Sequence, residues 1–189
     1  MYRLPWQREG THHRMEPDQE HRRFGLGMQV LAWISLLALL SLYFGDVLER
    51  QRNPNRDVAT NIGAEGVREV RLKRNRMGHY VASGTINGEP VVFLLDTGAT
   101  GVAIPEPLAR RLDLPRGRPF ITNTANGRTR SYQTRLDEVA IGDIRLENVD
   151  AAITPGLQMN EVLLGMSFLK YIEFTQRGNT LTLRQYPGA

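Results

Sequence analysis

The stretch Val91-Val92-Phe93-Leu94-Leu95-Asp96-Thr97-Gly98-Ala99-Thr100 decides how the rest of this 189-residue chain is interpreted. The apolar run 91–95 predicts a strand that is buried on both faces. The run ends in a carboxylate, a hydroxyl and a glycine, residue types that favour a tight turn. An aspartate delivered by a buried strand lies at low dielectric, where a carboxylate is costly unless it is used. We therefore predict a functional carboxylate at Asp96.

A second apolar element lies downstream. Val162-Leu163-Leu164 is again an apolar run, and it ends at Gly165. Between the two elements, Val102 and Ile104 alternate in the pattern of a strand. Two separate elements that agree in type and order favour a functional site over an ordinary turn in which the Thr97 side chain satisfies only the local backbone.

These residues resemble a known family. Asp96-Thr97-Gly98-Ala99 resembles the active-site loop of the aspartic proteases, and residues 162–165 resemble the element that packs beside this loop in the retroviral-type branch. More narrowly, the chain is similar to bacterial membrane-anchored retropepsin-like proteases, in which the segments found here at 124–127 and 163–169 recur. The resemblance covers Glu69 to Leu183. It implies a mostly β fold, a closed acid-protease barrel that forms a single retropepsin-like lobe with one or two short helices.

The resemblance also implies a chemistry. Aspartic proteases hydrolyse peptide bonds with a water held between two aspartates that share one proton, because like charges about 3 Å apart do not both ionise. This chain has a single Asp-Thr-Gly sequence, so the resemblance implies a homodimer in which each subunit supplies Asp96. Thr97 would hydrogen-bond across the two-fold axis, Gly98 allows close approach of the backbone, and Ala99 follows in the same loop. No metal or other cofactor is implied.

A later hairpin stands in the position of the family's flap, the element that covers a protein or peptide substrate. Asn126 and Gly127 form its turn and are the predicted substrate-binding residues of this hairpin. The turn lacks the glycine-rich tip of the viral enzymes. Met166-Ser167 also follows Gly165 where those enzymes often carry other residues.

The N-terminal third of the chain predicts a membrane anchor. The range 24–44 contains no charged residue, and as a helix it would span roughly 31 Å, about the hydrocarbon thickness of a bilayer. A cleaved signal peptide would have a shorter apolar region that ends in a small-x-small site, whereas this one ends Ser41-Leu42-Tyr43-Phe44. We expect a disordered basic tail at 1–23, a transmembrane helix at 24–44, a flexible linker at 45–66 and the protease domain at 67–189.

Flanking charges predict the orientation of this anchor. Arg22 and Arg23 lie at its N-terminal edge, whereas the arginines after it are partly offset by Asp46, Glu49 and Asp57. The imbalance favours a cytoplasmic N-terminus. With the resemblance, it implies a single-pass protein of the bacterial inner membrane whose protease domain is periplasmic or otherwise extracytoplasmic.

Composition argues against nucleic-acid binding and against sites that depend on cysteine. The sequence pI is about 9.8, and nearly all 24 basic residues are arginines, since only Lys73 and Lys170 are lysines. The arginines are scattered and do not alternate with aromatic residues, so we expect no nucleic-acid partner. The chain has no cysteine, which excludes disulfides and thiolate metal sites.

Short strands and glycine turns predict the rest of the domain. Val70 and Leu72 alternate with charged residues, as in a half-exposed strand at the edge of a sheet. The further expected elements are a hairpin at Asn87-Gly88, a helix at 105–112, strands at 120–124, 129–141 and 144–153, a short helix at 167–171 and a hairpin at Gly178-Asn179.

Two rival functions are weighed against the protease. Gly165-Met166-Ser167-Phe168-Leu169 is close to a nucleophile elbow, but Leu169 stands where the second glycine belongs. The stronger rival is a non-catalytic, membrane-anchored β-barrel module that binds peptides or partners. The intact Asp96-Thr97-Gly98 argues against it, because a binding module has no reason to place a carboxylate there.

Overall fold

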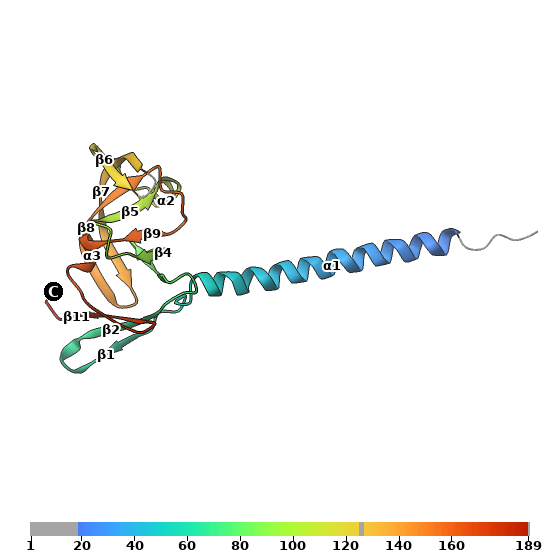
Figure 1. The fold of residues 1–189 in the computed structure, drawn as a ribbon, viewed down its shortest axis with the longest axis horizontal. Coiled ribbons are helices and arrows are strands. Elements are labelled where there is room, and N and C mark those ends of the chain that lie inside the picture. The colour runs from blue at the N-terminus through green and yellow to red at the C-terminus, as the bar shows by residue number, and fades with distance from the viewer. Residues whose placement is uncertain (1–18, 125–126, 189) are drawn as a thin grey trace, which may run out of the picture. The chain divides into compact units, whose positions relative to one another are not determined.

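The computed structural model describes residues 19–124 and 127–188, and it confirms a mostly β fold preceded by one apolar helix (Figure 1). The chain divides into two compact units, and the boundary between them in the sequence lies between Asp46 and Val47. Each unit is described by itself.

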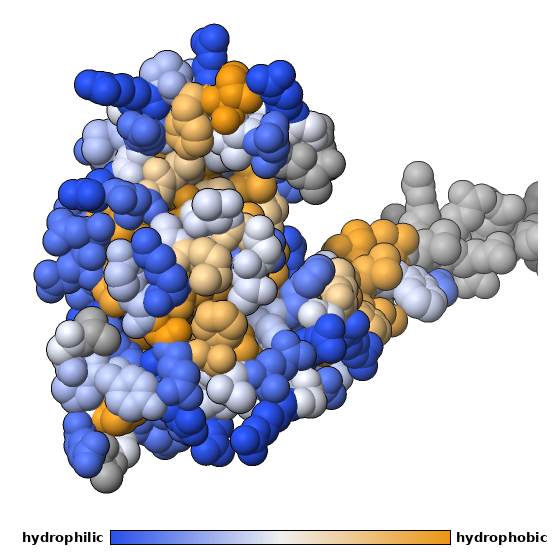
Figure 2. Space-filling view, turned by 60° about the vertical axis from the view of Figure 1, so that its left-hand side comes forward, coloured by the Kyte–Doolittle hydropathy of each residue, from blue (hydrophilic) through white to orange (hydrophobic). Residues whose placement is uncertain are grey.

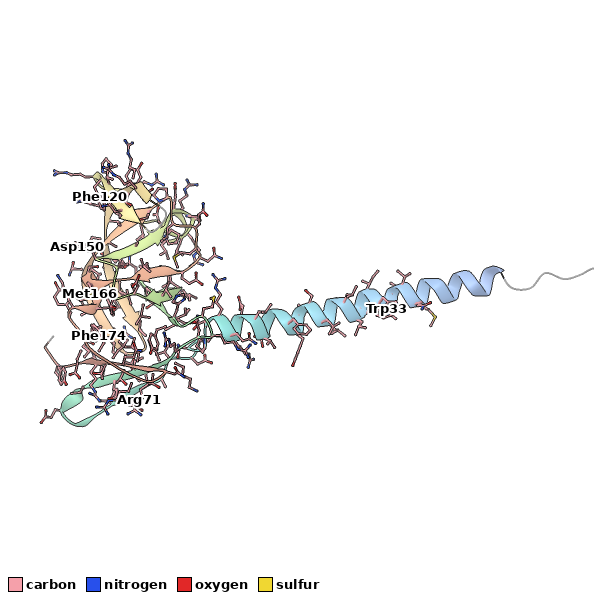
Figure 3. The ribbon with its side chains drawn as sticks, in the orientation of Figure 1. Trp33, Arg71, Phe120, Asp150, Met166 and Phe174 are labelled. Carbon is pink, nitrogen blue, oxygen red and sulfur yellow. The ribbon has the colours of Figure 1, made fainter. Side chains whose placement is uncertain are left out.

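The first unit is dominated by helix α1, Gln19–Arg52, which continues past the boundary of the unit. Its part from Gly27 to Arg52 is long and apolar enough to cross a membrane by length and composition. Large apolar side chains along it are exposed, among them Met28, Leu31 and Trp33. Trp33 is labelled in Figure 3. A helix of a soluble protein normally buries one such face.

Helix α1 is longer at both ends than the predicted span 24–44. Residues 1–18 of the predicted tail lie outside the described residues, and its remaining part, 19–23, is helical. Hydropathy marks only the apolar part of a helix, whereas Gln, Glu and Arg also have high helix propensity and extend it. Arg50 and Arg52 lie in its last turn, where positive charge interacts favourably with the helix dipole.

In its described residues, 47–124 and 127–188, the second unit contains eleven strands and short helices between them. The strands are β1 Thr60–Ile62, β2 Arg68–Lys73, β3 Tyr80–Ile86, β4 Glu89–Leu95, β5 Val102–Pro105, β6 Pro119–Thr124, β7 Gly127–Ile141, β8 Ile144–Thr154, β9 Val162–Leu164, β10 Glu173–Arg177 and β11 Thr180–Gln185. The helices are the 3-10 turn η1 Ala64–Gly66, α2 Glu106–Arg111 and α3 Met166–Leu169. The predicted hairpins and both short helices are therefore present, with boundaries shifted by a few residues.

Seven strands form one sheet in the order β3-β4-β9-β5-β8-β7-β6. A further pairing of β3 with β7, at Thr85↔Ala140 and Ile86↔Val139, joins the two ends of the first six strands. These six strands therefore make a closed ring of hydrogen-bonded neighbours, as a barrel requires. Strand β6 pairs only with β7 and extends outside the ring.

The other four strands form a second sheet in the order β1-β2-β11-β10. Strand β2 was predicted to lie at an edge, and this prediction is wrong because β1 pairs with it on one side and β11 on the other. Its alternation comes from its two faces: Val70 and Leu72 are fully buried, whereas Arg71 and Lys73 are exposed. One hydrophobic cluster contains side chains of both sheets, including Leu72, Phe93 and Leu183.

The predicted linker, residues 45–66, differs from the structure. It contains the end of α1, strand β1 and the turn η1, and Asn53 and Asn55 are buried. The Asn55 side chain donates to the carbonyl oxygens of Lys73 (2.9 Å) and Val81 (2.7 Å) and accepts from the Lys73 amide (2.7 Å). Polar, aperiodic sequence is typical of linkers, but asparagines that satisfy buried backbone groups give the same composition.

The surface of the second unit exposes several large apolar residues. On the face drawn in Figure 2, hydrophobic residues lie in the middle among hydrophilic ones. Exposed examples are Ile121, Tyr171 and Tyr186, and Phe120 of β6 and Phe174 of β10 are marked in Figure 3. A contiguous exposed apolar patch often marks an interaction surface, whereas single exposed apolar residues are ordinary.

Candidate active site

Strand β4 delivers the Asp-Thr-Gly loop from the interior of the large sheet. A tight hairpin joins it to β3, and both turn residues have positive φ, 52° at Asn87 and 82° at Gly88. This conformation favours Asn-Gly and matches the twist of the paired strands. On its other side β4 pairs in parallel with β9, from Phe93↔Val162 to Leu95↔Leu164. Asp96 therefore follows a strand that is held on both edges.

Backbone hydrogen bonds fix the loop at Asp96. The Asp96 amide donates to the carbonyl oxygen of Leu164 (3.1 Å), and the Ala99 amide donates to that of Asp96 (3.2 Å). The Asp96 carboxylate accepts from the Gly98 amide, with 2.8 Å between Oδ1 and N. A methyl group on Gly98 would lie 3.2 Å from the same Oδ1, so glycine keeps this turn tight.

Gly165 packs directly against the loop, as the sequence predicted for the second apolar element. A methyl group on Gly165 would lie 2.5 Å from the carbonyl oxygen of Ala99 and closer still to that of Gly101. Real Cβ atoms do not approach backbone oxygens so closely, so this contact requires glycine. The next amide, Met166 N, donates to Ala99 O (2.9 Å).

Ser167 makes structural contacts close to the loop that the sequence analysis did not predict. Its Oγ accepts a hydrogen bond from the Val102 amide (3.0 Å) and donates one to the carbonyl oxygen of Asp150 (2.9 Å). One hydroxyl therefore joins α3, the start of β5 and strand β8. The partners lie 65 and 17 residues away in sequence, and no local pattern indicates such contacts.

The predicted burial of the loop is wrong for the single chain. Asp96, Thr97 and Gly98 are exposed, and only alternate residues of the preceding strand, Val91 and Phe93, are buried. The reason is that the contacts of the loop come from one side, where residues 164–166 lie. Nothing in the described chain covers the other side.

The hairpin predicted to stand in the flap position is formed by β6 and β7, with a register from Pro119↔Tyr132 to Thr124↔Gly127. Asn126 lies outside the described residues, while Gly127 begins β7 with a φ of 106°. Toward the barrel, Ser131 Oγ and Thr154 Oγ1 are 3.1 Å apart in a buried hydrogen bond. This bond attaches the hairpin to β8.

Two cavities of about 550 and 420 Å³ lie elsewhere on the second unit. The larger is lined by residues 115–117, 133–135, Asp150 and Ala151, and the smaller by residues 146–150, Ser167, Lys170 and Tyr171. Neither includes residues 96–99. Within the described ranges, no group of three or more His, Asp or Glu side chains is arranged to hold a metal ion.

Comparisons with known proteins agree with this geometry. The family described as "gag-polyprotein putative aspartyl protease" matches residues 82–171. An uncharacterized protein in the cobV 5′ region of a Sinorhizobium species is 36% identical over 181 residues, which are 88% of this chain and 77% of that protein. A crystal structure of a retropepsin-like aspartic protease from Rickettsia conorii is similar with 25% identity and a TM-score of 0.53, covering 68% of this chain and 96% of that chain. The chain belongs to the retropepsin-like aspartic protease family.

The matched range contains both sequence elements described above. Residues 82–171 run from β3 to just past α3 and so include Asp96 and Gly165. An uncharacterized protein of Rickettsia prowazekii strain Madrid E, RP867, is 29% identical over 107 residues, which are 55% of this chain and 46% of that protein. Membership of this family supports an aspartic peptidase activity for the chain.

Proposed function

We propose that the chain is a membrane-anchored aspartic endopeptidase whose active site forms between two copies of the protein. Each copy would contribute one Asp96 carboxylate, and the pair would hold the attacking water. The observation that carries this proposal is the exposed loop 96–98, which is rigidly held on one side and open on the other. A loop of this kind is suited to form half of a two-fold site.

The proposed mechanism assigns a role to each loop residue. One Asp96 carboxylate accepts a proton from the water, while the other, protonated, donates to the scissile carbonyl. The shared proton belongs to the pair, since two ionised carboxylates at this distance would repel each other. Thr97 would hydrogen-bond to the partner loop across the two-fold axis. The Gly98 amide, bonded to Oδ1 at 2.8 Å, orients the carboxylate.

Helix α1 supports the anchor in this proposal, with the N-terminus in the cytoplasm and the protease domain outside it. Asn126 and Gly127 would cover a bound peptide from the flap. An accessibility assay on sealed vesicles, in which externally added protease digests only the exposed side, checks the orientation.

Substitution of Asp96 tests the proposed function. We expect Asp96→Asn in the full chain, purified in detergent micelles, to reduce cleavage of a peptide library to background while the melting temperature stays close to that of the wild type. Neutral Asn keeps the size of the side chain but accepts no proton as a base. The measurement is the initial rate with mass-spectrometric identification of products.

Asp143→Asn is the matched control, because Asp143 is an exposed aspartate in the turn between β7 and β8. It should cleave like the wild type. Full turnover by Asp96→Asn would refute the role of this carboxylate, and a folded wild type that binds peptides without cleaving them would favour the non-catalytic binding module.

A further inference from the structure

A buried carboxylate lies at the end of the loop that precedes β9. Glu161 is 7% exposed, and it is the one charged residue among the buried polar residues of ranges 19–124 and 127–188. Both of its oxygens face Arg52, with 2.7 Å from Nε to Oε1 and 3.1 Å from Nη2 to Oε2. A buried carboxylate is costly without such a partner, and a two-point contact with a guanidinium fixes its orientation.

Arg52 is itself held in place. It is the last residue of α1, where the Asn53 amide still donates to the carbonyl oxygen of Glu49 (2.8 Å). The carbonyl oxygen of Arg52 accepts from Asn75 Nδ2 (3.0 Å). The next residues are anchored as well, since Asn53 Nδ2 donates to Ser83 Oγ (3.0 Å). The guanidinium therefore extends from a fixed point.

Within ranges 19–124 and 127–188, the segment that ends at Glu161 forms few backbone hydrogen bonds. Residues 155–161 connect β8 to β9, and at their start the Leu157 amide donates to the carbonyl oxygen of Thr154 (3.1 Å). At their end the attachment is the ion pair with Arg52. Directly after Glu161, β9 pairs with β4, and Leu164 O accepts from the Asp96 amide.

We infer that Arg52 is a positioning residue for the proposed active site, because it holds Glu161 and thereby the start of the strand that supports Asp96. The end of helix α1 is then part of the working protease unit. Cutting the chain between Arg52 and the barrel would disturb the site without touching any catalytic residue. This inference rests on the proposed function in one respect, that Asp96 is taken as the catalytic carboxylate.

The test compares four variants of the full chain in detergent micelles. Arg52→Ala leaves a buried carboxylate uncompensated, so kcat/KM should fall by about tenfold or more, in the range expected when supporting residues are misplaced by around 1 Å. Glu161→Gln should cost less, because the Arg52 side chain is half exposed and water can solvate it. The double variant Arg52→Ala/Glu161→Gln should lose about as much activity as Arg52→Ala alone, because both changes remove the same contact. Arg52→Lys keeps the positive charge but loses the two-point contact of the guanidinium, so its kcat/KM should lie between those of the wild type and Arg52→Ala.

Arg56→Ala is the matched control, since Arg56 lies in the same segment and its ion pair with Glu49 (2.8 Å) is at the surface. It should stay within about twofold of the wild type, as surface pairs contribute little. A double variant whose loss is the product of the two single fold-losses would show that Arg52 does not act through Glu161. That result, or an Arg56→Ala effect as large as that of Arg52→Ala, would overturn the inference.

Hydrogen exchange separates this inference from the proposed function. In Arg52→Ala, amides 155–164 should exchange faster than in the wild type while strands β7 and β8 stay protected. If Arg52→Ala does not fold, Arg52→Lys should show the same local effect to a smaller degree. This result would support the positioning role even for a chain that cleaves no peptide. Unchanged exchange at 155–164 in every variant would refute it, whatever the activity.

Discussion

At the scale of single residues, the loop at Asp96 depends on glycines, whose lack of a side chain allows close packing. A methyl group on Gly165 would clash with two backbone oxygens, and one on Gly98 would crowd the Asp96 carboxylate. Both glycines belong to short sequence motifs, so the sequence identifies them. Asp96, Thr97, Gly98 and Gly165 could therefore be found from sequence. Ser167 could not, because a serine that bonds backbone groups of two distant strands has the same sequence signature as any surface serine.

Gly165→Ala tests the tight contact. The added methyl group would meet two backbone carbonyls, of Ala99 and Gly101, and neither moves without shifting the loop. We expect a loss of roughly 1–3 kcal/mol of unfolding free energy, as for overpacked cores, together with near-complete loss of cleavage. Urea denaturation and initial rates measure the two effects.

Gly63→Ala is the control for this substitution. A methyl group there lies in ordinary contact, 3.7 Å from the carbonyl oxygen of Val67, and should change stability by less than about 0.5 kcal/mol. Wild-type activity in Gly165→Ala would show that the loop tolerates displacement.

At the scale of elements, hairpins were predictable from sequence and the partners of the strands were not. Asn87-Gly88 and Gly178-Asn179 each join neighbouring strands, so local turn chemistry identifies them. Strand β2 illustrates the limit: its alternation predicts two faces, but its neighbours are β1, from the predicted linker, and β11, over 100 residues away. Pairing of distant strands depends on the whole barrel, which no single segment encodes.

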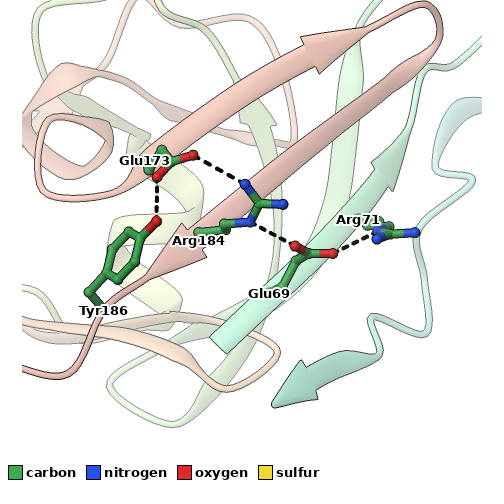
Figure 4. A network of polar contacts seen from close by, with 5 residues as sticks. All are labelled: Glu69, Arg71, Glu173, Arg184 and Tyr186. Carbon is green, nitrogen blue, oxygen red and sulfur yellow. Dashed lines mark hydrogen bonds and ion pairs between the residues drawn. The ribbon is translucent and has the colours of Figure 1, made fainter. Parts of the chain in front are cut away.

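The second sheet carries a charged network across three strands, and this network predicts a pH dependence (Figure 4). Glu69 accepts from Arg184 and Arg71, each at 2.7 Å. Glu173 accepts from Tyr186 (2.7 Å) and Arg184 (3.3 Å). Hydrogen bonds from Arg184, then Arg71, lower the pKa of Glu69, and the bond from Tyr186, then that from Arg184, lowers the pKa of Glu173.

Because both pKa values are lower in the folded chain than in the unfolded chain, the network stabilises the fold fully above the ordinary glutamate pKa, about 4.3. The stabilisation is lost as pH falls through the lowered values. We expect Glu69→Gln to melt below the wild type at neutral pH, and the two melting curves to converge in acid. Glu89→Gln, which removes an exposed glutamate of β4, should show no such convergence. A constant difference between wild type and Glu69→Gln at every pH would contradict the linkage.

At the scale of the whole molecule, the single Asp-Thr-Gly sequence of the chain is the basis of the proposed dimer. One Asp-Thr-Gly sequence predicts half a site, and this inference needs only the sequence and the chemistry of two carboxylates. The exposure of Asp96 agrees with it, since a complete site would cover the carboxylate. The expectation of burial failed in the single chain, and the proposed dimer gives a reason: a segment buried between two copies would have the same sequence pattern as one buried within its own chain.

Mixing subunits tests the shared site directly. When wild-type chains exchange freely with Asp96→Ala chains and both associate equally well, dimers form at random, and only those with two wild-type members hold both carboxylates. In an equal mixture, at concentrations well above the dissociation constant, about a quarter of the dimers should remain active, as follows for a two-fold assembly. The measurement is initial rate against wild-type fraction, after exchange is verified with a labelled subunit. A quadratic curve is expected. A chain that carries its whole site would instead give a straight line through one half, and that line would exclude the obligate dimer.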